Sequence, residues 1–251
     1  MKYFIIFFLA IQFLFGQSKM KPEETEVWEP EPKVVQPGVF LSPPSDAIIL
    51  FDGTDFSKWR SERTKGDVEW TLNPDKSMTV KPGKGGIETI DEHGSVQLHI
   101  EWKSPTVIKG EGQGRGNSGI FFQRRYEIQV LDSYQNRTYS NGQAGSIYKQ
   151  YIPLVNAMRP TGEWQVYDIV FKVPEFNDNG DEIKPGSFIV FHNGILIQNS
   201  VEIQGTTEYI GRPKKGRNVM PGFLGGDKRR SLMLQDHSDL VSYRNIWMRK
   251  L

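Results

Sequence analysis

An acid and an amide alternate with aliphatic residues in the segment YEIQVLD, residues 126–132. Successive side chains of an extended strand point to opposite faces, so Glu127 and Gln129 would share one face, and Ile128 and Val130 the other. If the aliphatic face enters a core, a carboxyl group and a carboxamide stand together on the open face. Such a pair can bind sugar hydroxyls or move a proton. The alternative is an ordinary solvated strand face.

A second polar pair ends another expected strand, in the segment LQDH at residues 234–237. By the same parity Gln235 and His237 share a face. Histidine is the side chain that titrates near neutral pH without perturbation, so His237 is the best acid–base candidate, although a histidine at a strand end can also be purely structural. A carbohydrate site requires both pairs to converge on a single open hollow.

Two further candidates lie in turns or at strand ends. Asn117 follows a glycine-rich stretch and runs into a strand, where it could face a ligand or belong to a flexible surface turn. No helix follows these glycines, so a phosphate-binding loop is not indicated. Asp132 could bind a ligand, act as a base or cap the turn after its strand, and the turn is the favoured interpretation.

The remaining candidates are charged or aromatic side chains on expected strands and loops. Glu101 and Arg244 could each clamp a sugar hydroxyl, or could pair with one another and order the site without touching substrate. Arg124 and Tyr148 are similar candidates for lining a cleft. The tryptophans are mostly expected in the core, though one could stack on a sugar ring.

Metal chemistry has little support in the sequence. The chain has no cysteine, which excludes disulfides, thiolate metal sites and a cysteine nucleophile. The HExxH pattern of zinc peptidases is absent. Calcium held by oxygen atoms of Asp132 or Asp236 is conceivable, but we expect no cofactor.

The pattern of the chain predicts an all-β domain. Residues 95–103 (SVQLHIEWK) alternate strictly, with Val96, Leu98, Ile100 and Trp102 on one face. Further short strands are expected at residues 118–123, 126–131, 164–173, 188–192, 195–198, 231–235 and 241–249. Turn signals separate them and no long amphipathic helix is evident, which favours a sandwich or a barrel.

The N-terminus predicts export. Residues 3–15 form an apolar run after Lys2, too short to cross a bilayer of about 30 Å, and Gly16 precedes a plausible cleavage point. We expect a signal peptide at residues 1–16, a proline-rich flexible segment at 17–46 and one domain at 47–251. The net charge of +1 does not indicate the strongly basic surface that nucleic-acid binding usually requires. The expected location is periplasmic or secreted, without a transmembrane segment.

Several short motifs occur in a characteristic order: FDGT (51–54) with Trp59, GNSGIFF (116–122), YEIQVLD, GSIY (145–148), EWQVY (163–167), HNG (192–194), LQDH and YRNIW (243–247). In this order they resemble the 3-keto-disaccharide hydrolase family over roughly residues 47–251. The resemblance implies a concanavalin A-like or laminin G-like jelly roll of two antiparallel sheets. It also implies that some members cleave glycosides already oxidised to a ketone at C3.

Three functions remain open at this point. The first is an enzyme that eliminates and hydrates 3-keto-glycosides, with Glu127 or His237 as base or acid. The second is a non-catalytic carbohydrate-binding module, and the third is a structural domain of the cell envelope. The jelly-roll glucanase pattern ExDxxE is absent, which counts against simple glucanase action.

Overall fold

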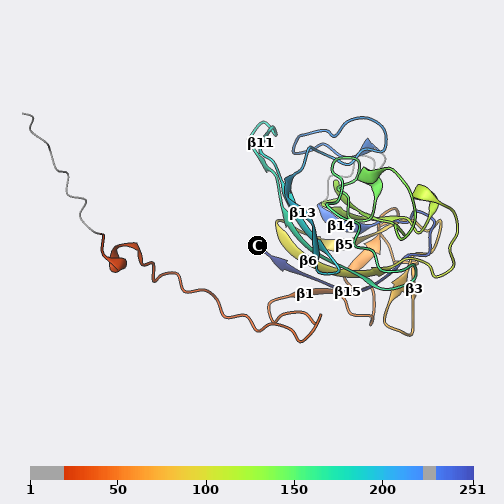
Figure 1. The fold of residues 1–251 in the computed structure, drawn as a ribbon, viewed down its shortest axis with the longest axis horizontal. Coiled ribbons are helices and arrows are strands. Elements are labelled where there is room, and N and C mark those ends of the chain that lie inside the picture. The colour runs from red at the N-terminus through yellow and green to blue at the C-terminus, as the bar shows by residue number, and fades with distance from the viewer. Residues whose placement is uncertain (1–19, 223–229) are drawn as a thin grey trace, which may run out of the picture. The chain divides into compact units, whose positions relative to one another are not determined.

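The computed structural model describes residues 20–222 and 230–251. The predicted signal peptide, residues 1–16, lies outside the described residues. The chain divides into two compact units, Met1–Val35 and Gln36–Leu251. The described part of the first contains a single short 3-10 helix, η1 (Pro22–Thr25). The second unit is almost entirely built of strands (Figure 1).

The larger of two sheets has eight strands. Their spatial order is β13 (Ile195–Glu202), β12 (Ser187–His192), β9 (Gln165–Lys172), β6 (Val96–Lys103), β15 (Ser242–Lys250), β4 (Met78–Thr79) and β3 (Thr71–Leu72), with β1 (Ile48–Phe51) also paired to β15. A separate hairpin joins β10 (Glu175–Phe176) to β11 (Glu182–Lys184).

The smaller sheet has five strands in the order β2 (Trp59–Ser61), β5 (Ile87–Glu92), β14 (Ser231–Leu234), β7 (Ser118–Phe122) and β8 (Tyr126–Val130). The paired strands of both sheets are antiparallel. Two short 3-10 helices, η2 (Gly112–Gly114) and η3 (Ser140–Gly142), lie in the loops beside β7 and β8. The expected two-sheet jelly-roll sandwich is confirmed.

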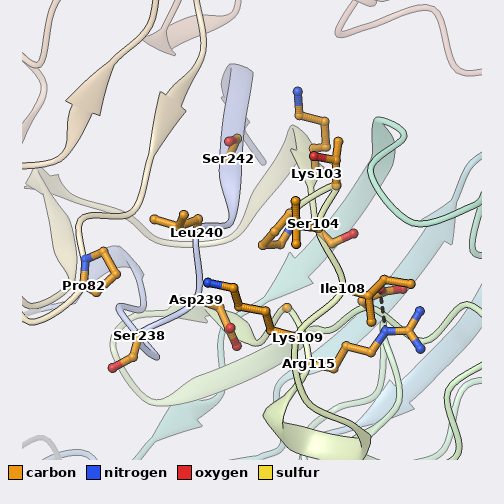
Figure 2. A pocket seen from close by; sticks show the side chains of 15 residues that line it. Pro82, Lys103, Ser104, Ile108, Lys109, Arg115, Ser238, Asp239, Leu240 and Ser242 are labelled. Carbon is orange, nitrogen blue, oxygen red and sulfur yellow. Dashed lines mark hydrogen bonds and ion pairs between the residues drawn. The ribbon is translucent and has the colours of Figure 1, made fainter.

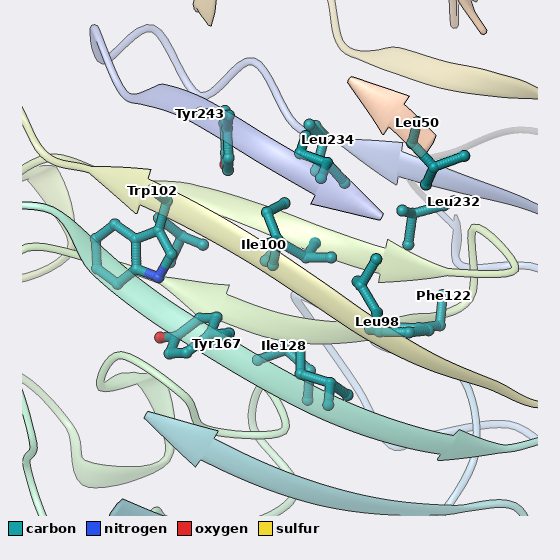
Figure 3. Close-up of a cluster of buried hydrophobic side chains, with 14 of the residues drawn as sticks. Leu50, Leu98, Ile100, Trp102, Phe122, Ile128, Tyr167, Leu232, Leu234 and Tyr243 are labelled. Atoms are coloured by element: carbon teal, nitrogen blue, oxygen red, sulfur yellow. The ribbon is translucent and has the colours of Figure 1, made fainter. Parts of the chain in front are cut away.

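The core lies between the sheets, and strand parity selects its members. Val96, Leu98, Ile100 and Trp102 are completely buried on one face of β6, as the alternation predicts. Figure 3 shows Leu98, Ile100 and Trp102 in one cluster with residues of the smaller sheet. From that sheet the buried members include Ile120, Phe122, Ile128, Leu232 and Leu234. The apolar face of each strand therefore faces inward, and the opposite face of the smaller sheet is left for polar side chains.

The segment from residue 36 to residue 46, which the sequence assigns to the tether, contacts the sandwich. Asp46 pairs with Arg249 of β15, with 2.7 Å between Oδ1 and Nε. Asn245 donates a hydrogen bond to the carbonyl oxygen of Leu41 at 2.9 Å. Compact packing thus begins at Gln36, ahead of β1.

Within residues 20–222 and 230–251, no helix has the length and apolarity that crossing a membrane requires.

Candidate active site

A tight hairpin between β7 and β8 sets the position of the central acid. The loop consists of residues 123–125, and the N–H of Arg125 donates to the carbonyl oxygen of Phe122 at 3.0 Å. Gln123 and Arg124, at the centre of this turn, both have positive φ angles, 52° and 57°, as a type I′ turn requires. This turn pairs Phe121 with Glu127 and Gly119 with Gln129. Because Ile128 enters the core, Glu127 and Gln129 point to the outer face of the five-stranded sheet.

The end of β14 lies directly beside this hairpin. The main-chain N–H of Gln235 donates to the carbonyl oxygen of Gly119 at 3.0 Å, and the Ser118 hydroxyl donates to the Gln235 carbonyl oxygen at 2.7 Å. These bonds attach the LQDH segment to β7. As a result, Gln235 and His237 meet the same open face as Glu127 and Gln129.

All four residues line one cavity of about 570 Å³. This volume falls within the roughly 300–1,000 Å³ that small-molecule sites occupy. Asn117 and Tyr148, also expected at the site, lie in its wall. The described residues of the lining are Gln113, Asn117, Glu127, Gln129, Tyr139, Tyr148, Lys149, Tyr209, Gln235 and His237. The two polar pairs of the sequence therefore do meet in a single hollow.

Glu127 is the most unusual group in this cavity because it is buried without a charged partner. Only 4% of the residue is exposed. No cation of the described part of the chain forms an ion pair with it, and burial raises the pKa of Glu127 well above its ordinary value. Its main-chain N–H donates to Thr207 Oγ1 at 2.9 Å, which fixes the backbone rather than the carboxyl group. Burial therefore favours the protonated form of this carboxyl group.

A glycine makes room for that carboxyl group. A Cβ atom added to Gly119 would lie 2.4 Å from Glu127 Oε1 and 2.8 Å from Phe121 Cε2. Gly119 sits opposite Gln129 in the register and does not adopt a left-handed conformation, so its role here is space and not backbone freedom. The floor of the cavity beneath Glu127 is thus bare main chain.

His237 differs from Glu127 in almost every respect. It is exposed at the edge of the cavity, whereas Glu127 is buried. Its imidazole has no hydrogen-bond partner among residues 20–222 and 230–251. A solvent-accessible imidazole and a buried carboxyl group in one cavity can act together as a general acid and a general base.

Aromatic side chains form another wall. The hydroxyl groups of Tyr139 and Tyr148 are 2.6 Å apart, and burial raises the pKa of both. The ammonium group of Lys149 lies 4.6 Å from the centre of the Tyr209 ring and donates to the Tyr209 carbonyl oxygen. Phenol rings offer apolar faces for a sugar ring and hydroxyls for its oxygens.

The sequence interpretation missed Gln113, Tyr139, Lys149 and Tyr209. All four lie outside the strands. Strand parity therefore carried no information about them. The one available signal was the position of Gln113 within the glycine-rich stretch that introduces Asn117.

Arg124 is not part of the cavity lining. It is buried at the β7–β8 turn and forms an ion pair with Glu88 of β5, which also pairs with Arg60 at 2.9 Å. Glu88 is completely buried. A charge in that setting needs its partners, so Arg124 stabilises the sheet beside the site. Its expected role in binding substrate is therefore not supported by its position.

Asp132 also lies outside this cavity. Its Oδ2 accepts hydrogen bonds from Arg115 Nε and Thr161 Oγ1, both at 2.8 Å, and its Oδ1 accepts from the N–H of Tyr134 at 3.3 Å. The last contact is the turn that the sequence favoured for this residue. Asp132 and Arg115 instead line a second cavity of about 550 Å³, shown in Figure 2.

Glu101 and Arg244 lie on the eight-stranded sheet, in β6 and β15, and thus not in the cavity. Arg244 Nε donates to Glu101 Oε2 at 2.6 Å, so the two residues pair with one another, which is the second of the two alternatives that the sequence left open, and their position does not support a role in binding substrate. Arg244 also stacks on Trp164, with 4.1 Å between the guanidinium carbon and the ring centre. Burial alone would raise the pKa of Glu101, but its charged neighbours and Asn245 lower it to about 2.

His99 completes this second cluster. Its Nδ1 lies 2.7 Å from Asp168 Oδ1, and its ring stacks on Trp247 with 5.0 Å between centres. Burial would lower the pKa of His99, yet the interactions with Asp168 and Glu101 raise it to about 8. Because His99 and Glu101 are almost completely buried, the cluster stabilises the sheet and does not form an open site.

The described residues contain no group of three or more histidine or acidic side chains placed to hold a metal ion. Asp236, the other calcium candidate, accepts hydrogen bonds from the N–H groups of Gly85 and Ser238, both at 2.9 Å.

The fold is a jelly roll with an open polar cavity, and the family and a similar solved structure indicate the glycan-active, glycosyl hydrolase-like class. The chain belongs to the family of the 3-keto-alpha-glucoside-1,2-lyase-like domain, whose model matches residues 46–249. This agrees with the family that the motifs indicated.

Solved structures support the same class. A protein from Parabacteroides distasonis ATCC 8503, described as a "putative glycosyl hydrolase", is 46% identical, with a TM-score of 0.85 over 94% of this chain and 99% of that one. A second protein from this organism, described in the same words, is 19% identical with a TM-score of 0.56, over 82% of this chain and 94% of that one, and shows the fold alone. No curated protein matches the sequence.

Proposed function

We propose that this protein cleaves glycosides whose sugar already carries a ketone at C3, by elimination followed by addition of water. The observation that carries the proposal is the buried carboxyl group of Glu127, whose pKa is raised by burial, in a cavity that also holds an exposed imidazole. Membership of the 3-keto-alpha-glucoside-1,2-lyase-like family supports the same chemistry.

The reaction needs only modest catalytic groups. A ketone at C3 acidifies the hydrogen on C2, so a base removes that proton and the electron pair moves into an enolate. The C1–O bond then breaks, and the leaving oxygen takes a proton from an acid. Water finally adds across the C1–C2 double bond, with its hydroxyl on C1 and its hydrogen on C2. Each proton transfer can be assisted by one positioned side chain.

The cavity contains groups suited to each step. His237 and Glu127 supply the acid–base pair. The side-chain amides of Asn117 and Gln235 can donate hydrogen bonds to the enolate oxygen, where negative charge develops. An ordinary glycosidase would instead place two carboxyl groups roughly 5–9 Å apart across the bond. Glu127 is the single carboxyl group in the described lining, which favours the keto-sugar route.

A binding module without turnover is the second candidate, and the wall of Tyr139, Tyr148 and Tyr209 favours it. The experiment that separates the two is incubation of the purified protein with a 3-keto-disaccharide and, in parallel, with its unoxidised parent. Release of free sugar from the keto compound alone supports the enzyme. Binding of either sugar without release would contradict the proposal and support the module.

We also propose that the protein is exported to the periplasm or secreted, on the basis of its apolar N-terminal run. The test is fractionation of the cells that produce it, with N-terminal sequencing of the mature chain. A chain that begins near Gln17 in the exported fraction supports the proposal. A full-length chain in the cytoplasm would contradict it.

A further inference from the structure

Three side-chain amides around Glu127 are oriented by main-chain carbonyl groups. Gln113 Nε2 donates to the carbonyl oxygen of Gly142 at 2.9 Å, and to Thr138 Oγ1 at 3.0 Å. A carbonyl oxygen can only accept, so the NH₂ group of Gln113 must face Gly142. The Gln113 side-chain oxygen is therefore turned toward Gln129.

Asn117 is fixed in the same manner. Its Nδ2 donates to the main-chain carbonyl oxygen of Gln113 at 2.7 Å. Its main-chain N–H donates to Asp239 Oδ2 at 2.8 Å, which anchors the backbone. The Asn117 side-chain oxygen therefore also points to Gln129. Two fixed oxygen atoms thus face one end of the Gln129 amide.

Gln129 can satisfy these two oxygens in only one orientation. Its Nε2 lies 3.1 Å from Gln113 Oε1 and 3.4 Å from Asn117 Oδ1, and donates to both. The other end of the amide lies 3.0 Å from Glu127 Oε1 and 3.2 Å from the carbonyl oxygen of Ser118. In this orientation that end is the Gln129 oxygen, so Glu127 must supply a proton for a hydrogen bond to form.

The reversed orientation is worse, because it opposes two pairs of oxygen atoms, whereas the first orientation opposes only the Gln129 oxygen and the Ser118 carbonyl oxygen. Turning the amide would place its NH₂ group on Glu127 and Ser118 but set its oxygen against the oxygens of Gln113 and Asn117. Both of those oxygens belong to amides that carbonyl groups hold in place, and neither can gain a proton. Four oxygen atoms surround a single NH₂ group, and Glu127 is the one among them that can carry an extra proton.

We infer that Gln113 and Gln129 form an amide relay, anchored on the Gly142 carbonyl group, that holds Glu127 in its protonated form. Glu127 then enters the reaction as the proton donor, and His237 is left as the base. This assignment of roles rests on the proposed function, whereas the protonation state does not. When the leaving oxygen takes the proton, the carboxylate left behind faces the Gln129 oxygen, which favours its reprotonation by solvent.

The relay adds to the effect of burial on Glu127, and no cation of the described part of the chain forms an ion pair with this carboxyl group. Tyr139, Tyr148 and Tyr209 come from loops, His237 follows β14, and Tyr243 of β15 acts through the sheet. Lys149 directs its ammonium group to the Tyr209 carbonyl oxygen and not to Glu127. Gln113 acts through Gln129 and is therefore a positioning residue.

The test is the pH dependence of stability, which needs no sugar. A carboxyl group whose pKa is higher in the folded state than in the unfolded chain loses stability as pH rises between those two values. Glu127→Gln resembles the protonated acid and removes this loss. The Tm of Glu127→Gln minus the Tm of the wild type should therefore increase by about 3–5 °C for each pH unit across that window, from about pH 4.5 upward. If the Tm of the wild type instead rises relative to that of Glu127→Gln as pH increases, the inference is overturned.

Gln113→Ala tests the relay itself. Without the Gln113 side chain only the Asn117 oxygen still opposes a turn of the Gln129 amide, so its NH₂ group can reach Glu127 more easily. The increase with pH of the Tm difference between Glu127→Gln and Glu127 should therefore be smaller in that background. Gln150→Ala is the matched control, because Gln150 also joins two loops, through Gly205 and Gln204, but does not line the cavity. If the Tm difference between Glu127→Gln and Glu127 increases with pH as much in the Gln113→Ala background as in the wild-type background, the relay is overturned.

A spectroscopic measurement on the wild type guards against variants that fail to fold. The side-chain carboxyl carbon of Glu127, observed by carbon-13 NMR, should show the chemical shift of a neutral acid at pH 7. A shift typical of a carboxylate would overturn the inference. Neither measurement involves turnover, so the relay and the proposed function are tested independently. The measurements can refute the relay even if the protein cleaves keto sugars, and they can support the relay even if it does not.

Discussion

Gly119→Ala is the perturbation that probes the geometry of the site most selectively. The added Cβ would lie 2.4 Å from Glu127 Oε1 and 3.0 Å from its Cδ. Ordinary contact begins near 3.4 Å, so the carboxyl group must move by about 1 Å. A misplacement of that size can lower the rate of a reaction about 100-fold. Insertion of a methyl group into a packed site typically costs only about 1–3 kcal/mol of stability.

The expected result is therefore a folded protein with severely reduced activity. We would measure kcat/KM for sugar release from a 3-keto-disaccharide, together with Tm. Gly94→Ala is the matched control, since a Cβ there meets nothing within 4 Å and its backbone is not left-handed. The control should retain wild-type activity and stability. If Gly119→Ala is folded and its kcat/KM is within threefold of wild type, the position assigned to Glu127 plays no part in catalysis and the reasoning is wrong.

Four further substitutions test other parts of the account. His99→Gln should remove a contribution of about 2 kcal/mol to the free energy of unfolding, because the pKa of His99 is about 8 in the folded protein. This contribution is fully present below pH 6.5 and is lost as pH rises through about 8, so we would measure the free energy of unfolding at several pH values. If the pH dependence is the same in the variant and the wild type, the His99–Asp168 pairing is contradicted. His237→Asn should lower kcat about 100-fold or more with little change in Tm, and an unaffected kcat would exclude His237 as the base. Tyr209→Ala should raise KM about tenfold through loss of one aromatic face, whereas an unchanged KM would place the sugar elsewhere. Arg244→Ala should leave kcat/KM unchanged, and a large decrease in kcat/KM would show that Arg244 does take part in the substrate site.

Alternation along single strands predicted the parts of the structure that depend on local geometry. The inward face of β6 follows directly from the spacing of Val96, Leu98, Ile100 and Trp102. The shared outer face of Glu127 and Gln129 follows for the same reason. Parity is reliable here because both strands lie against one core, so that one face of each strand is turned toward the core and the other away from it.

Parity could not decide which sheet a strand joins. Glu101 also lies on the polar face of its strand, but β6 belongs to the eight-stranded sheet, and its outer face is the opposite surface of the sandwich from the cavity. Arg244 lies beside it on β15 for the same reason, since register pairs Arg244 with Glu101. Only the order of strands across the two sheets separates these residues from Glu127.

Loop residues were beyond prediction because loops have no periodicity. Tyr139, Lys149 and Tyr209 reach the cavity from segments distant in sequence, and their approach depends on how each loop packs. Gln113 is the clearest case, since its role depends on a carbonyl group of Gly142 in another loop. The chemistry that the sequence assigned to two polar pairs thus depends on neighbours that it could not identify.

The most direct test of the proposed chemistry is to carry out the cleavage of a 3-keto-disaccharide in deuterium oxide. Elimination and hydration replace the hydrogen on C2, so the released sugar should carry one solvent deuterium at that carbon, beyond the exchange seen without protein. The Glu127→Gln variant should release little sugar. A released sugar that keeps its original hydrogen on C2 would show direct displacement at C1 and would contradict the account.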